Sequence, residues 1–234
     1  MIFGGRSSGT IMITPIPKLL NTVQIQALRN LIKQGEFEDG KKTAGWHAKD
    51  VKRNRQWQAS DEIKQQLNEH LTQTLSSCAE FTARTYAKNL MPFIVSLSTQ
   101  GGGYGDHIDD ALMHHEHLVR TDISCTVFLS DPNEYDGGEL VMTLGGVEMS
   151  YKLNAGDVII YPSTTLHRVN PVTSGSRLVA LTWIESLVSG ADKREMLYDL
   201  DCARKGIMGQ QGKTSEFDLI TKTHANLLRR WATT

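Results

Sequence analysis

Short apolar runs separated by turn-forming residues occupy the middle of this 234-residue chain, from about residue 89 to residue 187. The run Met91 to Leu97 is β-prone and ends near three consecutive glycines, and residues 131–138 form the clearest turn region. Runs of this length, bounded by Gly, Asn, Asp and Pro, predict strands joined by turns. Many such strands in succession predict a barrel or a sandwich of sheets.

The regions on either side have helical patterns. Asn21 or Thr22 can cap a helix, and Ser60 with Asp61 can open another, because apolar residues follow both sites at helical spacing. Between these helices, residues 35–45 are interpreted as rich in turns, and a last helix is predicted from about Ser215. The chain therefore divides into a disordered extension (1–11), a helical and mixed support region (12–88), a β core (89–187) and a C-terminal helical region (188–234).

The charge is balanced, with 25 Lys and Arg against 26 Asp and Glu. A net charge of −1 does not favour binding to nucleic acid or to a membrane surface. The sequence contains no apolar stretch long enough to span a bilayer, and its first residues lack the apolar core of an export signal. The three cysteines contain no Cys-x-x-Cys pair, so a reducing cytoplasm fits best.

His107 and Asp109 form the first candidate pair of metal ligands. In a strand, positions two apart point to the same face, so both side chains can reach one ion; Tyr104 falls outside this parity. A His-x-Asp pair alone is a weak signal, and a rival cluster occupies residues 114–117. That cluster, His114, His115, Glu116 and His117, is interpreted as a solvated loop, with a contribution to metal capture or to the rim of the site as the alternative.

His167 and Arg177 complete the pattern, each on a later predicted strand. Two imidazoles and one carboxylate leave three positions of an octahedral ion open, as iron(II) oxygenases require and closed tetrahedral zinc sites do not. An arginine suits the far carboxylate of a chelating 2-oxo acid, because its planar fork pairs bidentately and stays charged. Each of these residues alone would more often have a structural role, or lie at the surface, than bind a metal or a co-substrate. Together they predict a site for Fe(2+) and 2-oxoglutarate.

From Met12 onward, the chain resembles the bacterial PKHD-type hydroxylases. These form a prolyl/lysyl-hydroxylase-like branch of the Fe(II)/2-oxoglutarate dioxygenases that is linked to iron uptake. The matching stretches are Val51–Gln56, Tyr104–Asp109, Arg120–Ser130, Tyr135–Leu140, Gly156–Pro162, Leu166–Val169, Trp183–Ser186 and Asn226–Trp231.

This resemblance implies a mainly β fold with flanking helices and a double-stranded β-helix (jelly-roll, cupin-like) core. It implies His107, Asp109 and His167 as iron ligands, Arg177 as the 2-oxoglutarate anchor and L-ascorbate as a supporting reductant. The chain departs from its relatives near Ser98, where they often carry a tyrosine that helps to hold the co-substrate. A serine replaces such a contact only in part.

Substrate contacts are suggested by position alone. Lys52, Asn54 and Gln56 alternate, so a strand would present them on one face, either as a pocket wall or as a solvated surface. Tyr104 is a further candidate, with packing as the alternative. Trp183 is interpreted as core. Arg120 and Asp122, at the entry to a strand, are expected to form a salt bridge.

The function predicted is hydroxylation, with O2 as co-substrate and release of succinate and CO2. The substrate would be a peptidyl proline- or lysine-like side chain or a small molecule, in connection with iron uptake. The alternative is a non-catalytic sensor of metal or 2-oxoglutarate on the same fold. All four site residues are present, however, whereas a non-catalytic descendant of an enzyme often loses one of them. The last helix is expected to pack outside the sheet or, alternatively, to form part of a homodimer interface.

Overall fold

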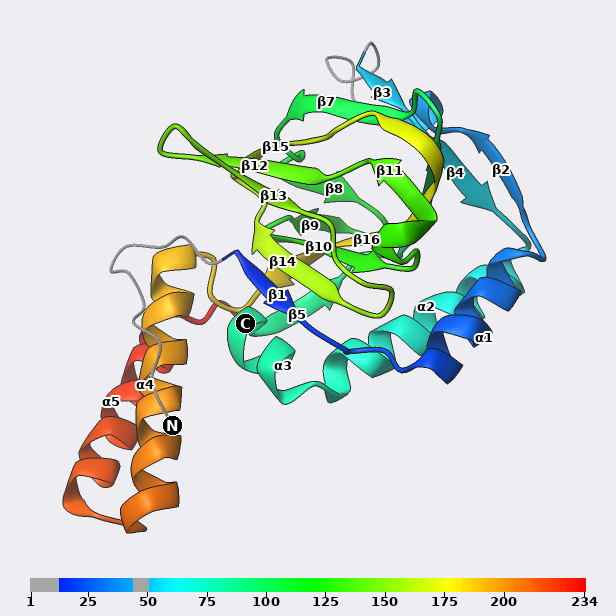
Figure 1. Cartoon of the computed structure of the whole chain (residues 1–234). Helices are drawn as coiled ribbons and strands as arrows, with labels where there is room; N and C mark the ends of the chain where they lie inside the picture. Colours follow the sequence, from blue (N-terminus) through cyan, green and yellow to red (C-terminus); the bar gives the residue numbers. More distant parts are fainter. Residues whose placement is uncertain (1–12, 44–50) are drawn as a thin grey trace.

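The computed structural model describes residues 13–43 and 51–234, so the extension predicted for residues 1–11 lies outside the described residues. Two facing β-sheets form the body of the molecule, and helices cover the outer face of the larger one (Figure 1). A pair of helices extends away from this body. The predicted mainly β fold with flanking helices is confirmed.

The larger sheet is antiparallel throughout its main path, with strand order β1-β14-β10-β16-β6-β4-β2, and β11 and β5 also pair with β16. All six residues of β10 are buried, because the sheet is covered on both faces. The strands are β1 (Thr14–Ile16), β2 (Glu36–Asp39), β4 (Arg55–Gln58), β5 (Ala87–Leu90), β6 (Ile94–Thr99), β10 (Ile123–Phe128), β11 (Tyr135–Gly137), β14 (Val158–Pro162) and β16 (Val172–Ser186).

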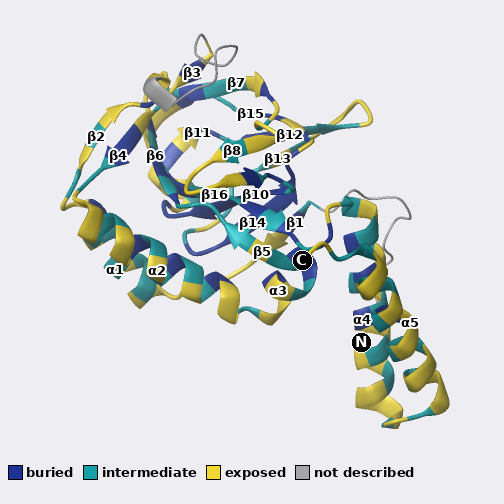
Figure 2. Cartoon of the chain, turned by 180° about the vertical axis from the view of Figure 1, so that it is seen from behind, coloured by how far each residue is buried: buried dark blue, intermediate teal, exposed yellow. Residues whose placement is uncertain are grey.

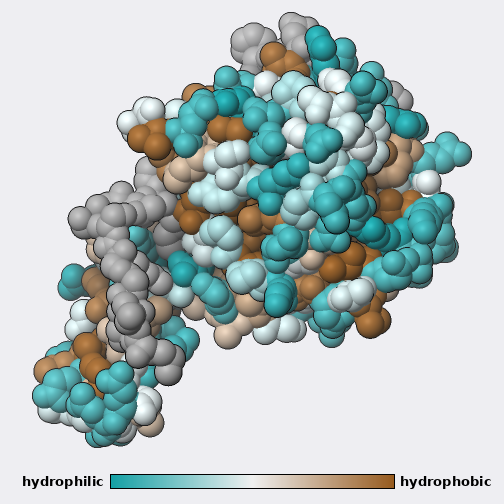
Figure 3. Space-filling model, viewed as in Figure 1, coloured by the Kyte–Doolittle hydropathy of each residue, from teal (hydrophilic) through white to brown (hydrophobic). Residues whose placement is uncertain are grey.

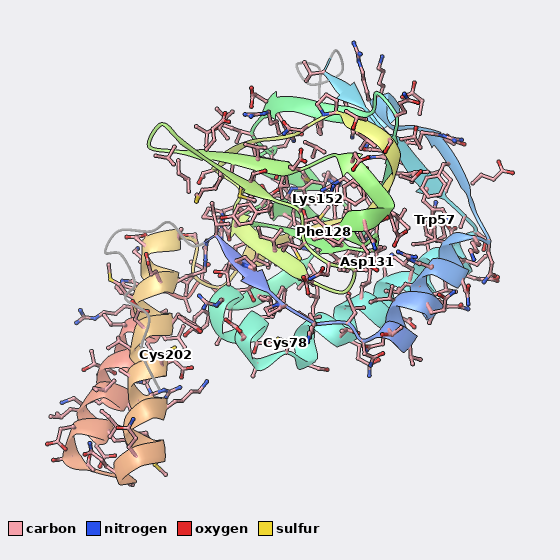
Figure 4. All side chains as sticks on the ribbon, viewed as in Figure 1. Trp57, Cys78, Phe128, Asp131, Lys152 and Cys202 are labelled. Atoms are coloured by element: carbon pink, nitrogen blue, oxygen red, sulfur yellow. The ribbon has the colours of Figure 1, made fainter. Side chains whose placement is uncertain are left out.

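The smaller sheet has the order β13-β12-β15-β7-β3, and a separate hairpin of β8 and β9 lies beside it. Phe128 of β10 and Met142 of β12 belong to one apolar cluster, which fills the space between the two sheets; Phe128 lies inside the body (Figure 4). The strands are β3 (Lys52–Arg53), β7 (Gly103–His107), β8 (Leu112–His114), β9 (Leu118–Arg120), β12 (Leu140–Leu144), β13 (Val147–Tyr151) and β15 (Leu166–Val169).

The interpretation of residues 35–45 as turns was wrong for part of that range. Glu36–Asp39 forms β2, which pairs with β4, and a 3-10 helix follows at Gly40–Thr43. β2 is an edge strand with mostly exposed, acidic side chains. Backbone hydrogen bonds to β4 hold it in place, and a sequence pattern does not reveal such bonds.

The two predicted N-terminal helices are confirmed. Asn21 caps α1 (Thr22–Ile32) through a hydrogen bond of 3.0 Å from the Gln24 amide, and Ser60 caps α2 (Asp61–Ser77). With the short helix α3 (Ala79–Thr85), they cover the outer face of the larger sheet (Figures 1 and 2). Their buried apolar side chains join the larger core cluster.

Replacing Leu71 of α2 with alanine should destabilise this core. Leu71 is 1% exposed in the cluster between α2 and the sheet. We expect a loss of about 2–5 kcal/mol in the free energy of unfolding, from lost burial and from the cavity left behind. Urea denaturation followed by circular dichroism measures this loss. Val147→Ala, at a position 63% exposed, is the control and should change stability by less than about 0.5 kcal/mol. Equal effects would show that α2 does not anchor the core.

The C-terminal helices are α4 (Ala191–Gln211) and α5 (Ser215–Trp231), which Thr214 caps, so the predicted start of the last helix is confirmed. The expectation that this helix packs on the outside of the sheet was wrong: α5 packs along α4, and the pair stands apart from the sheets (Figure 1). Within the described residues, every helix is too short or too polar to cross a membrane. Cys78 and Cys202 lie far apart (Figure 4), and all three cysteines are free thiols.

Candidate active site

The structure brings His107, Asp109 and His167 together inside the body. Their ligand atoms all lie within 4.8 Å of one another, and the His167 Nε2 atom is 3.9 Å from the Asp109 Oδ2 atom. His107 ends β7, and His167 lies directly opposite it on β15. Cross-strand pairing therefore places the two imidazoles side by side, and the chain that follows β7 carries the carboxylate to them. One metal ion could contact all three residues.

Hydrogen bonds orient each of these side chains. The Nδ1 atoms of His107 and His167 lie 2.8 and 2.9 Å from the carbonyl oxygens of Gly105 and Thr165, respectively. An Nδ1 that donates to a carbonyl leaves Nε2 with its lone pair toward the centre of the site, as metal binding requires. Burial, and then the neighbouring His167, lowers the pKa of His107 to about 4, so its imidazole is neutral at neutral pH.

Ser124 orients the carboxylate. Its hydroxyl donates a hydrogen bond of 2.5 Å to Asp109 Oδ2 and lies 2.8 Å from the Ser163 hydroxyl. A Ser124→Ala variant should bind divalent metal about 10- to 100-fold more weakly, because the hydrogen bond from the Ser124 hydroxyl fixes the orientation of the Asp109 carboxylate. Metal titration by calorimetry measures this change. Ser150→Ala, at an exposed position on β13, is the control. An unchanged affinity in Ser124→Ala would show that the hydroxyl does not position Asp109.

Two details of strand β7 differ from the prediction. β7 ends at His107, so Asp109 lies beyond the strand rather than within it. Tyr104 does share the face of His107, since their rings stack with centroids 3.6 Å apart. On β7 the paired positions are three residues apart, Tyr104 to His107, but on β15 they are two apart, His167 to Val169. This β-bulge reverses the parity between the two residues, which strict alternation could not predict.

Arg177 lies near the start of β16, opposite Ser98 on β6. It is 3% exposed, and burial lowers the pKa of its guanidinium. Within the described residues, the Arg177 Nε atom and the Tyr135 hydroxyl are both buried without a hydrogen-bond partner, and the two side chains interact electrostatically. A buried guanidinium with an unpaired donor and a nearby hydroxyl suits a carboxylate ligand. These residues fit the far end of 2-oxoglutarate.

Sequence reasoning missed Tyr135. The only signal was its place at the start of the family motif Tyr135–Leu140, but the surrounding turn residues hid a short strand, β11, that pairs with β16. Tyr135 is 2% exposed, and burial raises the pKa of its hydroxyl, which therefore stays protonated and can donate. Ser98, which was predicted to contact the co-substrate, is buried and lines the same cavity as Arg177.

A cavity of about 540 Å³ connects the three metal-binding candidates with Arg177. One part of its lining is polar and another is apolar. All four predicted substrate contacts belong to the polar part: it contains Lys52, Asn54, Gln56, Ser96, Ser98 and Tyr104. The apolar part contains Met91, Pro92, Ile94, Met113, Leu181 and Trp183.

The polar wall is internally organised. The Asn54 amide donates a hydrogen bond of 2.6 Å to the Ser96 hydroxyl. The Lys52 ammonium lies 5.4 Å from the centroid of the Tyr104 ring. Burial lowers the pKa of Lys52, whereas the charge of Asp109 raises it; burial raises the pKa of Tyr104 to about 12. The wall therefore offers donors and acceptors close to the metal-binding candidates.

Comparison with known proteins identifies the family. Residues 93–185 match the 2OG-Fe(II) oxygenase superfamily, and residues 192–233 match the PKHD-type hydroxylase C-terminal domain. A PKHD-type hydroxylase of Colwellia psychrerythraea is 62% identical over 95% of this chain and 100% of that protein. The chain belongs to the PKHD-type hydroxylases. Another, from Gloeothece citriformis, is 46% identical over 94% of this chain and all of that protein.

The hydroxylase is therefore an Fe(II)/2-oxoglutarate-dependent dioxygenase, as predicted, and uses O2 and a substrate. Solved structures share its fold at low sequence identity. A prolyl-4-hydroxylase from Pseudomonas putida aligns with a TM-score of 0.53 and 19% identity, over 74% of this chain and 92% of that one. HygX from Streptomyces hygroscopicus, with nickel, 2-oxoglutarate and hygromycin B bound, has a TM-score of 0.53 and 14% identity, covering 76% and 84%.

Other predictions near the site have mixed outcomes. Interpreting Trp183 as core was wrong: it lines the cavity, because it shares the inward parity of Arg177 along β16. All four residues of the cluster at 114–117 are exposed, as the solvated-loop interpretation predicts. His114 and His115, at the β8–β9 hairpin, also line the cavity, as the alternative of a place at the rim predicts. The salt bridge between Arg120 and Asp122 is confirmed, at 2.7 Å.

Proposed function

We propose that the hydroxylase binds Fe(2+) through the Nε2 atoms of His107 and His167 and the carboxylate of Asp109, and 2-oxoglutarate through Arg177. One observation carries this proposal: the three candidate ligands and the buried guanidinium line a single cavity. When bound, the metal and 2-oxoglutarate supply the oxidising chemistry that hydroxylates a C–H bond and releases succinate and CO2.

The residues of the chain supply position and environment. Asp109 and the two imidazoles would hold the metal, and three protein ligands would leave positions for 2-oxoglutarate and O2. Arg177 pairs with the far carboxylate, and Tyr135 and Ser98 add hydroxyl donors beside it. The apolar part of the lining keeps water away from the reacting C–H bond, while Lys52, Asn54, Gln56 and Tyr104 orient polar groups of the substrate.

The volume of this cavity supports the proposed substrate classes. Its volume of about 540 Å³ lies in the range that takes drug-sized ligands, which suits a peptidyl proline- or lysine-like side chain or a compact small molecule. Both classes occur among proteins of this fold. A Trichoplax adhaerens prolyl hydroxylase was solved with a peptide fragment, and HygX with hygromycin B. The proposal includes a role in iron uptake and L-ascorbate as reductant, on the basis of the family resemblance. It also includes a cytoplasmic location, on the basis of the three cysteines without a Cys-x-x-Cys pair.

The test follows succinate formation by the purified protein with Fe(2+) and 2-oxoglutarate, with and without L-ascorbate. A panel of proline- and lysine-containing peptides and of siderophores is added one at a time. We expect one class to raise succinate formation above the uncoupled background and to gain 16 mass units, the mass of one oxygen atom. Absence of any 2-oxoglutarate-dependent succinate, with metal bound, would contradict the proposed roles.

A further inference from the structure

Lys52 is a buried cation in the wall of the cavity. It lies on the short strand β3, directly opposite Tyr104 of β7, and is 7% exposed. Lysine side chains are almost never buried this far unless other groups stabilise their charge. Lys52 interacts with other groups of the protein. Because an ammonium has three donor hydrogens, it can bind a ligand in the cavity in addition to such contacts.

Ring contacts place the Lys52 ammonium close to the candidate metal ligands. It lies 5.4 Å from the centroid of the Tyr104 ring, and this ring stacks on the His107 imidazole with centroids 3.6 Å apart. The ammonium is also within electrostatic range of His107 and Asp109. A group bound by Lys52 would therefore lie in the same part of the cavity as a metal held by these ligands.

The charges of the cavity assign separate tasks to its charged residues. Within the described residues, four charged side chains line it: Lys52, Asp109, Asp110 and Arg177. Asp110 is exposed, so water and salt screen its charge. In the proposed function, Asp109 binds the metal and Arg177 binds the far carboxylate of 2-oxoglutarate, whose two negative charges balance those of Fe(2+). Lys52 is then the buried charge on the substrate side of the cavity.

We propose that the substrate carries a carboxylate that Lys52 binds, and a hydrocarbon part that lies along the apolar part of the lining and is hydroxylated there. This inference rests on the proposed function, since it assigns the substrate class of the same site. A cavity of low dielectric strengthens the attraction between an ammonium and a carboxylate. It also strengthens the repulsion between Lys52 and a cationic group, so a compact carboxylic acid is favoured over a lysine side chain.

The groups beside Lys52 are neutral and suit the rest of a carboxylate. Gln56 of β4 lies opposite Ser96 of β6, and both are buried in the polar part of the lining. The Asn54 amide donates to the Ser96 hydroxyl and so fixes its position. Burial raises the pKa of Tyr104 to about 12, so its hydroxyl stays protonated and can donate. These groups can bind the second carboxylate oxygen without competing with it in charge.

The apolar part of the lining suits a hydrocarbon chain. Ile94 of β6 lies directly opposite Leu181 of β16. Trp183 is two residues further along β16 and so shares the face of Leu181. All three side chains line the cavity, and burying hydrocarbon against them removes apolar surface from water. Lys52 on one part of the lining and these residues on another therefore match a molecule with an anionic end and an apolar end.

The outer surface near Lys52 also suits a charged, water-soluble molecule. β3 and β7 lie at the top of the body in Figure 1, and hydrophilic or neutral residues predominate over this part of the body in Figure 3. Large exposed apolar patches mark sites for protein or membrane partners instead. A compact carboxylic acid needs no such patch.

The first test compares three probes with the same six-carbon chain: hexanoate, hexanamide and hexylammonium. Each is titrated by calorimetry into the protein loaded with Fe(2+) and saturating 2-oxoglutarate, with O2 excluded, so that Arg177 is already occupied. We expect hexanoate to bind at least about tenfold more tightly than hexanamide, because hydrogen bonds to charged groups contribute more than those between neutral groups. Hexylammonium should bind most weakly. Equal affinities for hexanoate and hexanamide, or no binding of hexanoate, overturn the proposal.

The second test repeats these titrations with variants whose fold is checked by circular dichroism. Lys52→Met keeps an apolar stem without the charge and should lose the preference for hexanoate, whereas Lys52→Arg keeps the charge and should retain it. The control Lys88→Met removes the same charge at an exposed position of β5, outside the cavity lining, and should keep the full preference. A preference that persists in Lys52→Met, or that is lost in Lys52→Arg or Lys88→Met, contradicts the role of the Lys52 charge.

Succinate formation separates this inference from the proposed function. The wild-type protein is assayed with Fe(2+), 2-oxoglutarate and O2 and without any probe. If succinate forms but hexanoate is not preferred, the carboxylate class is wrong and the proposed function stands. If no 2-oxoglutarate-dependent succinate forms, the proposed function is wrong, and the titrations still decide whether Lys52 recognises a carboxylate.

Discussion

An Asp109→Ala variant is expected to lose iron binding and 2-oxoglutarate turnover together while keeping its fold. Asp109 is the only carboxylate of the three-residue group, so it is the one ligand that would neutralise part of the charge of the ion. Removing a residue that only hydrogen-bonds to a metal ligand costs about 10- to 100-fold in metal affinity, so loss of the ligand itself should cost more than about 100-fold. Metal titration by calorimetry and succinate release measure the two effects.

Asp110→Ala is the matched control. Asp110 is the next residue, also lines the cavity and is exposed, but it does not belong to the three-residue group. Its alanine variant should bind Fe(2+) with nearly wild-type affinity. If Asp109→Ala released succinate at the wild-type rate, or if both variants lost metal equally, the assignment of Asp109 as a ligand would be wrong.

The sequence predicts the fold well where local chemistry and tertiary structure agree. Asn21 and Ser60 cap helices because their side chains accept from backbone amides within three residues, a local event. Strands β10 and β14 are mostly apolar and buried throughout, in agreement with their position between the helices and the second sheet. β2 escaped prediction, since its polar residues form a strand only through bonds to β4.

The residues of the site could likewise be predicted where their own chemistry identifies them, and could not where tertiary structure decides their position. His107, Asp109, His167 and Arg177 are recognisable because few residue types perform this chemistry, and the structure brings all four to one cavity. The position of Tyr104 depended on a bulge, which alternation does not reveal. The position of Trp183 depends on which face of β16 meets the cavity. The position of Tyr135 depends on the pairing of β11 with β16, which joins residues far apart in the sequence.

An Arg177→Met variant should raise the KM for 2-oxoglutarate by about 30-fold to several thousandfold. Truncating one partner of a buried, hydrogen-bonded charge pair costs about 2–5 kcal/mol, and each 1.4 kcal/mol is about tenfold in affinity. Methionine keeps most of the apolar volume of the arginine stem, so the neighbouring Phe128 ring, 5.6 Å from the guanidinium carbon, keeps a packing partner. Succinate release as a function of 2-oxoglutarate concentration measures the change, and metal affinity should stay close to wild type.

Two other arginines separate this role from a structural one. Arg194 is also buried, but it donates to the carbonyl oxygens of Val188 and Ser189, outside the cavity lining. Arg194→Met should therefore lower stability without raising the KM. Arg168, on the outside of β15 and paired with Glu148, should change neither quantity appreciably. Arg177→Lys keeps the charge but loses the planar fork, so its KM should fall between wild type and Arg177→Met. A wild-type KM in Arg177→Met would show that the far carboxylate of 2-oxoglutarate does not bind to the Arg177 guanidinium.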